Sequence, residues 1–75
     1  MEMIIVSPLQ GQWTVRRRGQ PHHQTFLNGA TAEAAARQLG AALAHDGVES
    51  EIRVFLRDGS LAGVIRCPAV EAYPA

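Results

Sequence analysis

An Asp-Gly dipeptide at positions 58 and 59 constrains the fold of this chain more than any other feature of its sequence. Asp-Gly tolerates the positive φ angles of a two-residue type I′ turn, which joins two adjacent antiparallel strands. We therefore predict a β-hairpin in which Arg57 pairs with Ser60. This register places three facing pairs on a core side of the hairpin: Leu56 with Leu61, Val54 with Gly63, and Ile52 with Ile65.

The same register places polar and apolar side chains together on the second side of the hairpin. The facing pairs on that side are Phe55 with Ala62, Arg53 with Val64, and Glu51 with Arg66. We predict a cross-strand ion pair between Glu51 and Arg66. Such a surface pair contributes roughly 0.2 to 1 kcal/mol, which favours the register without implying a function.

Three further strands are predicted before the hairpin, at residues 3–6, 13–18 and 22–27. The first is a continuous apolar run with β-branched residues, which is typical of a strand covered on both faces. The second alternates, because Trp13 and Val15 point to one face while Thr14 and Arg16 point to the other. In the third strand we expect Phe26 to turn inward.

Residues 31–44 are the one segment with helical periodicity. Its apolar residues recur at spacings of three and four and form one stripe, which consists of Ala32, Ala35, Ala36, Leu39 and Leu43. Glu33 and Arg37 fall together on the outer side. We predict Thr31 as the N-cap and Asp46-Gly47 as the end of the helix. Because the stripe is mostly alanine, the helix can lie close to a sheet.

Together these elements predict an α+β domain with an antiparallel sheet in the order β-β-β-α-β-β and a single helix packed on one face. We expect one domain at residues 1–68, because a chain of 75 residues has room for one small core. Residues 69–75 follow Pro68 and are expected to form a loosely ordered C-terminal tail or a strap over a sheet edge.

The sheet face opposite the helix is predicted to be uncovered and is the best candidate for a functional surface. It combines arginines with apolar side chains, including one side of the apolar first strand. The predicted interaction surface consists of Arg16, Arg18, Arg53, Phe55, Arg57, Val64 and Arg66. Arg17 is expected on the other face, so the three consecutive arginines do not form one patch.

The sequence resembles the small bacterial domain-of-unknown-function family 2188 over about residues 4 to 66. The resemblance rests on Trp13-Thr14-Val15, Gly19, Phe26, the alanine-rich helix with Ala35, Ala36 and Leu39, and Arg57-Asp58-Gly59 followed by Leu61. Residues 28–31 and 48–50 lengthen the two ends of the helix relative to the family pattern. The resemblance implies a bacterial protein with this fold order, and it implies no activity or catalytic residues, since the family has none that are established.

The sequence predicts no enzyme, no metal site and no cofactor. It contains no Lys, no glycine-rich phosphate loop and no carboxylate pair tied to a recognisable pocket. His22 and His23 diverge on a strand, and no Cys or acid stands nearby at ligand spacing. We interpret His45 as a helix C-terminal residue and Cys67, the single cysteine, as a small apolar filler.

The partner has to be inferred from charge and surface, because no motif identifies it. Seven Arg face seven acidic residues, so an attraction to nucleic acid requires a local patch. The lone cysteine and the lack of a long apolar run or signal-peptide core predict a cytoplasmic protein without a membrane partner. We expect a small interaction module that forms a homo-oligomer, most simply a dimer, through the uncovered sheet face. Two alternatives stay open: a nucleic-acid-binding accessory protein that uses the same face, and a small inhibitor that docks on a larger protein.

Overall fold

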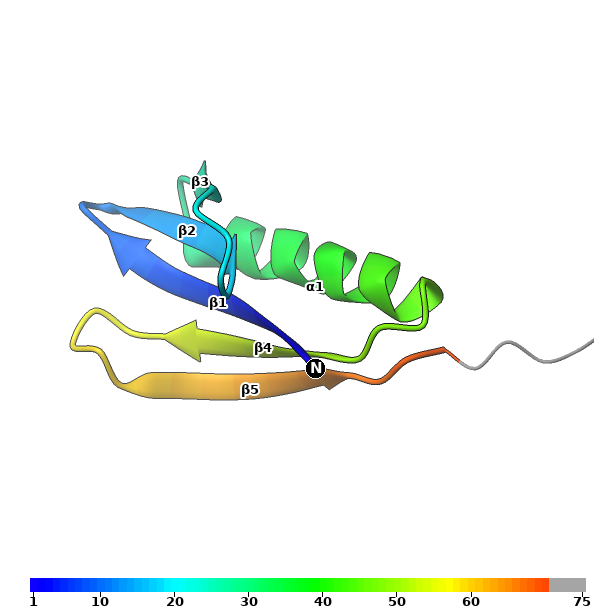
Figure 1. The fold of residues 1–75 in the computed structure, drawn as a ribbon. Helices are drawn as coiled ribbons and strands as arrows, with labels where there is room; N and C mark the ends of the chain where they lie inside the picture. The colour runs from blue at the N-terminus through cyan, green and yellow to red at the C-terminus, as the bar shows by residue number, and fades with distance from the viewer. Residues whose placement is uncertain (71–75) are drawn as a thin grey trace, which may run out of the picture.

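The structure is a computed structural model that describes residues 1–70. Within this range, five strands and one helix follow one another in the order β-β-β-α-β-β, as predicted. Their bounds are Glu2–Leu9 for β1, Gln12–Arg17 for β2, His23–Phe26 for β3, Gly29–His45 for α1, Ser50–Phe55 for β4 and Leu61–Cys67 for β5. The α+β class is confirmed, with α1 packed against one face of a five-stranded sheet (Figure 1).

The sheet is mixed, so the prediction of a purely antiparallel sheet is wrong. Its strands lie side by side in the order β3-β2-β1-β4-β5. β1 and β4 are parallel, whereas the other three neighbouring pairs are antiparallel. The parallel pairing arises because α1 connects β3 to β4. The helix carries the chain back along the sheet, so β4 runs in the same direction as β1.

The central position of β1 follows from its composition. Its apolar run at residues 3–6 is removed from water most fully where neighbouring strands cover both of its edges. β3 is a short strand with mostly exposed side chains and forms one edge of the sheet. β4 therefore pairs with β1 and not with β3.

The hydrophobic core lies between the sheet and α1. Its buried members are Ile4, Val6, Val15, Ala32, Ala36 and Ile52. Partly buried side chains surround them, namely Trp13, Phe26, Leu39, Leu43, Val54, Ile65 and Cys67. The predicted helix stripe is therefore confirmed for Ala32, Ala36, Leu39 and Leu43, whereas Ala35 is partly buried outside this cluster. The predicted inward positions of Trp13, Val15 and Phe26 are confirmed as well.

The helix begins two residues earlier than predicted, and its N-cap is Asn28 instead of Thr31. Asn28 Oδ1 accepts hydrogen bonds from the Thr31 backbone N–H at 2.8 Å and from the Thr31 hydroxyl at 2.7 Å. Thr31 thus lies inside the first turn, where its N–H needs an acceptor from outside the helix. The helix ends at His45, directly before Asp46 and Gly47, as predicted.

The β4–β5 hairpin has the predicted register over most of its length. The four observed pairs that match the prediction are Glu51–Arg66, Ile52–Ile65, Arg53–Val64 and Val54–Gly63. A β-bulge then brings Phe55 opposite Leu61 instead of Ala62. The predicted core pair of Leu56 and Leu61 is wrong, since both side chains are about half exposed.

The turn of this hairpin is also of a different type from the predicted one. Gly59 N–H donates to the Leu56 carbonyl at 3.0 Å, and Leu56 N–H donates to the Ser60 carbonyl at 2.8 Å. Gly59 has a φ of 85°, whereas the φ of Asp58 is not positive. A type I′ turn requires positive φ at both positions, so the connection is a type I turn followed by a left-handed glycine. The extra loop residue accounts for the shift at Phe55.

The end of the described chain lies against the C-terminal end of α1. Val70 N–H donates a hydrogen bond to the Ala44 carbonyl at 3.0 Å. The rest of the predicted tail, residues 71–75, lies outside the described residues. Among residues 1–70 there is no helix with the length and apolar character needed to cross a membrane.

Candidate interaction surface

The sheet has one face that α1 does not cover, and we call it the open face (Figure 1). Strand alternation and pairing place its side chains in three rows across the sheet. The middle row contains His23, Arg16, Ile5, Arg53 and Val64, and the row toward the hairpin turns contains Thr25, Thr14, Ser7 and Phe55. The third row contains Arg18, Met3, Glu51 and Arg66.

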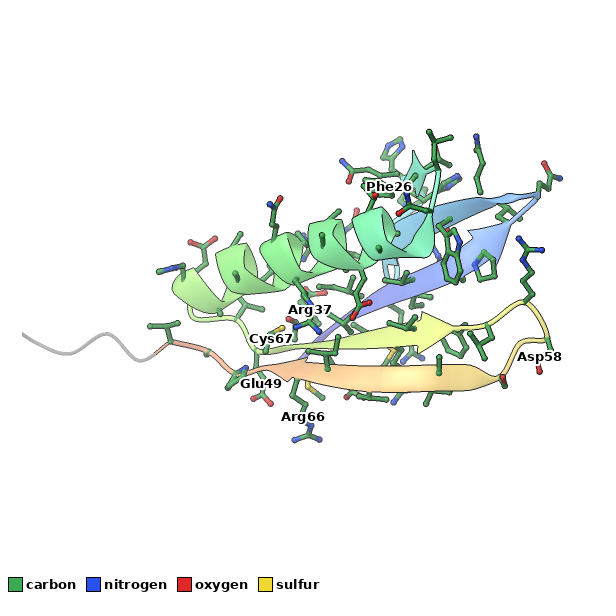
Figure 2. All side chains as sticks on the ribbon, turned by 180° about the vertical axis from the view of Figure 1, so that it is seen from behind. Phe26, Arg37, Glu49, Asp58, Arg66 and Cys67 are labelled. Atoms are coloured by element: carbon green, nitrogen blue, oxygen red, sulfur yellow. The ribbon has the colours of Figure 1, made fainter. Side chains whose placement is uncertain are left out.

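Six of the seven residues predicted for the interaction surface belong to this face. Arg18 lies one residue beyond β2, and its N–H donates to the Met3 carbonyl at 2.8 Å, which continues the ladder. Figure 2 shows Arg66 pointing away from α1, while the next residue, Cys67, lies between β5 and the helix. The prediction is wrong for Arg57, which lies in the turn and not in the sheet.

Glu51 is the one acidic side chain on the open face of the described chain, and it is nearly buried at 7% exposure. Its Oε1 accepts a hydrogen bond from Arg53 Nε at 3.2 Å. The predicted ion pair with Arg66 is wrong, although Arg66 does lie directly opposite in the ladder. Arg53 is two residues along the same strand as Glu51 and on the same face. Its guanidinium, and not that of Arg66, therefore contacts the Glu51 carboxylate.

The structure sorts the charges of a neutral chain by face. Among residues 1–70, four arginines and one acid belong to the open face, which gives it a surplus of three positive charges. Arginines on the helix side have acidic partners: Arg17 Nη2 is 3.0 Å from Glu2 Oε1, and Arg37 Nη2 is 3.2 Å from Glu33 Oε1. The other described residues include three arginines and five acids, which leaves a surplus of two negative charges away from the open face.

Apolar side chains lie between the arginines of the open face. Met3, Ile5 and Phe55 are partly buried, whereas Val64 is 45% exposed. Leu9, at the end of β1, is 50% exposed and lies on this side by strand alternation. The alternation of β1 could have identified Leu9 from the sequence, but its placement beyond the predicted strand at residues 3–6 concealed it.

Polar side chains on β1 and β2 stabilise the open face near the hairpin turns. The hydroxyls of Ser7 and Thr14 are 3.2 Å apart, and Thr14 Oγ1 also donates to the Ser7 carbonyl at 3.1 Å. Thr14 is buried even though it is on the open face. These hydrogen bonds hold β1 and β2 together beside Phe55, and sequence alternation alone gave no sign of them.

The residues that are typical of metal or catalytic sites remain dispersed. Within residues 1–70, no three His, Cys, Asp or Glu side chains gather in a way that could hold a metal ion. Cys67 packs against the core, with Ser50 as its partner on β4. The open face, where arginines and half-exposed apolar side chains gather, is the candidate interaction surface.

Comparison with known proteins adds no further constraint. No protein-family model, curated protein or solved structure matches this chain.

Proposed function

We propose that this protein is a small interaction module whose open face binds single-stranded nucleic acid. The observation that carries the proposal is the surplus of three positive charges on the face that the helix leaves uncovered. A neutral chain has no overall attraction to a polyanion, so a sorted surface is what such binding requires. Of the four arginines, Arg53 is engaged by Glu51, which leaves Arg16, Arg18 and Arg66 for phosphate contacts.

The neighbouring side chains favour a single strand over a duplex. Phe55 is partly exposed, and an aromatic ring stacks on any unpaired base. Arginine guanidinium planes stack on bases as well, so Arg16 and Arg53 add to one aromatic ring. The hydroxyl of Thr25 and the imidazole of His23 extend the face with hydrogen-bonding groups at the β3 edge.

Self-association through the same face is the second candidate, and the exposed Leu9 and Val64 favour it. Burying a Leu or Val side chain completely is worth about 1.5 to 3 kcal/mol, so these two half-exposed residues and their neighbours supply roughly 2 to 4 kcal/mol per copy. Two unit charges 10 Å apart, the spacing of packed sheets, repel by roughly 0.4 kcal/mol in water and 1.7 kcal/mol near a protein surface.

The positive charge of the open face favours nucleic acid over a second copy of the chain. With three uncompensated arginines on each copy, three facing charge pairs cost roughly 1 to 5 kcal/mol, which offsets a large part of the roughly 4 to 8 kcal/mol that two copies gain from apolar burial. A nucleic acid carries negative phosphates, which attract these arginines, and its binding releases counterions. Nucleic acid is therefore the occupant that this surface favours.

Oligonucleotide binding and its salt dependence test the proposal. We expect a fluorescently labelled single strand to bind at 50 mM salt and to lose affinity by roughly 20-fold at 200 mM, the slope for about three phosphate contacts. The double variant Arg16→Ala, Arg66→Ala should weaken binding and flatten the slope. Arg37→Ala is the matched control, because Arg37 lies on the outer side of α1 and pairs with Glu33.

Light scattering on the same samples tests the second candidate. If the chain is a dimer that ignores oligonucleotides, nucleic-acid binding is refuted and self-association takes its place. In that case Val64→Glu should give monomers, whereas Leu27→Glu should not, since Leu27 is 84% exposed and outside the open face. A monomer that ignores DNA and RNA would refute both candidates and leave docking on another protein.

A further inference from the structure

A groove at the β2–β3 edge, mainly on the helix side of the sheet, has the features of a second site. It lies between α1 and the β2–β3 end of the sheet and has a volume of about 330 Å³. Val15, Ala35 and Leu39 supply apolar surface. The other lining residues are polar, namely Arg16, Arg17, Gln20, His22, His23 and Gln24. This size and this mixture are typical of sites for small molecules. We call it the β2–β3 groove.

Arg17 gives the groove its chemical character. One of its five N–H donors is engaged, since Nη2 is 3.0 Å from Glu2 Oε1. Its Nε–H is buried and has no hydrogen-bond acceptor among the described residues. A buried donor without an acceptor is unfavourable. Since this N–H does not face solvent, a ligand reaches it only when the partly exposed Arg17 side chain turns toward the groove, and an anionic ligand would then supply the missing acceptor.

The other residues around the groove narrow the class of ligand. No acidic side chain lines it in the part of the chain that the structure describes, so an anion meets no like charge from the lining. Gln24 lies opposite Val15 in the β2–β3 ladder and adds amide donors next to apolar surface. A ligand that satisfies both surfaces has a negative head and a short hydrocarbon body.

We propose that the β2–β3 groove binds a small organic carboxylate. In the bound state the Arg17 guanidinium turns toward the groove and presents Nε–H and one Nη–H to the carboxylate as a bidentate pair. The hydrocarbon part then covers Val15 and Leu39. Arg17 points to the helix side of the sheet, whereas Arg18 and Arg66 belong to the open face, so these residues separate the two proposed sites. Arg16 and His23 lie where the groove meets the open face and border both.

Replacement of Glu2 tests whether a carboxylate ligand binds Arg17. Its carboxylate already contacts the guanidinium that the ligand would bind, so the two anions compete. Glu2→Gln should therefore tighten carboxylate binding, by roughly two- to five-fold for a partly exposed pair. A purely structural role of the Glu2–Arg17 pair predicts no such gain.

Amide NMR titrations with sodium hexanoate, sodium benzoate and inorganic phosphate test the proposal. We expect saturable shifts around Val15, Gln24 and Leu39 with both carboxylates and weaker binding of phosphate, which has no hydrocarbon body. Arg17→Gln should abolish saturation, whereas Arg18→Gln should leave it unchanged, because Arg18 follows on the open-face side. The dispersion of the amide spectrum shows whether each variant is folded.

Three results would overturn the assignment. Shifts that rise linearly with hexanoate would show that there is no site. Equal affinity of Arg17→Gln and the wild type for hexanoate would show that Arg17 is not part of the site. If Arg17→Gln does not fold, the hexanoate affinity of Glu2→Gln provides the second check. Phosphate binding as tight as hexanoate binding would show a simple anion site without an apolar contribution. Loss of oligonucleotide binding in Arg18→Gln would affect only the proposed function.

Discussion

At the scale of single residues, Gly40 shows how closely α1 approaches the sheet. Gly40 is buried in the middle of the helix, where glycine costs about 1 kcal/mol relative to alanine. A Cβ at this position would lie 2.7 Å from Cys67 Sγ and 3.3 Å from Cys67 Cβ. The missing side chain therefore makes room for the cysteine, which explains a residue that the helix itself disfavours.

We expect Gly40→Ala to destabilise the protein by roughly 1 kcal/mol. Overpacking typically costs about 1 to 3 kcal/mol, and the better helix propensity of alanine returns up to about 1 kcal/mol. In a Cys67→Ala background the same change should be neutral or stabilising, since the sulfur is gone. Chemical denaturation of the four proteins measures this coupling, and a stabilising Gly40→Ala in the wild type would contradict the contact.

Asp58 is the second residue whose environment has a measurable consequence. The Ser60 hydroxyl, with its oxygen 2.6 Å from Asp58 Oδ1, and the Ser60 N–H at 2.9 Å both donate to the carboxylate and lower the pKa of Asp58 below 3.8. The folded state then binds fewer protons than the unfolded state. The stability from this group is present above about pH 3.8 and is lost as the pH falls through the lower folded-state pKa.

Ser60→Ala should raise the pKa of Asp58 toward its ordinary value, because it removes the larger of the two hydrogen-bond effects. An NMR titration of the Asp58 carboxyl carbon measures this pKa directly. If the titration midpoints of variant and wild type coincide, the Ser60 hydroxyl does not hold the carboxylate in solution.

At the scale of elements, the β4–β5 turn depends on one backbone conformation. Gly59 has a φ of 85°, which a β-branched residue resists strongly. Gly59→Val should therefore destabilise the protein by roughly 1 to 2 kcal/mol. Gly63→Val is the matched control: Gly63 lies in β5 without a positive φ, and a Cβ there meets no atom within 4 Å. Thermal denaturation compares the two, and equal losses would refute the turn assignment.

At the scale of the whole molecule, β1 joins the two halves of the sheet through its pairing with β2 and β4. Its alternate residues enter different environments. Ile4 is completely buried in the core below α1, whereas Ile5 is partly buried on the open face. The comparison of these two neighbours therefore reports whether the open face is covered in solution.

Ile4→Ala should cost about 2 to 5 kcal/mol, and Ile5→Ala should cost clearly less, because its side chain leaves a smaller cavity. Denaturant unfolding at several protein concentrations measures both changes. A loss at Ile5 that matches the loss at Ile4 and grows with protein concentration would mean that a second copy covers the face. That result would favour self-association over the proposed nucleic-acid site.

Local patterns in the sequence were enough to predict most of the elements and the side of the sheet on which many residues lie. The spacing of Ala32, Ala36 and Leu39 identified the helix and its buried stripe, and alternation placed Arg53 and Val64 on the open face. Such patterns succeed because the periods of a helix and a strand are properties of the backbone within a few residues. The family resemblance and the position of the domain boundary remain predictions.

Contacts between segments far apart in the sequence determined the strand pairing and the distribution of charge, which local patterns did not predict. The parallel pairing of β1 with β4 depends on which strand edge buries the most apolar surface, and no local period encodes that choice. The partner of Glu51 was decided by competition between two nearby arginines. A net charge of zero likewise says nothing about which charges share a face. The positive open face, the position of Arg17 beside the β2–β3 groove and its unpaired Nε arise only when the strands are brought together.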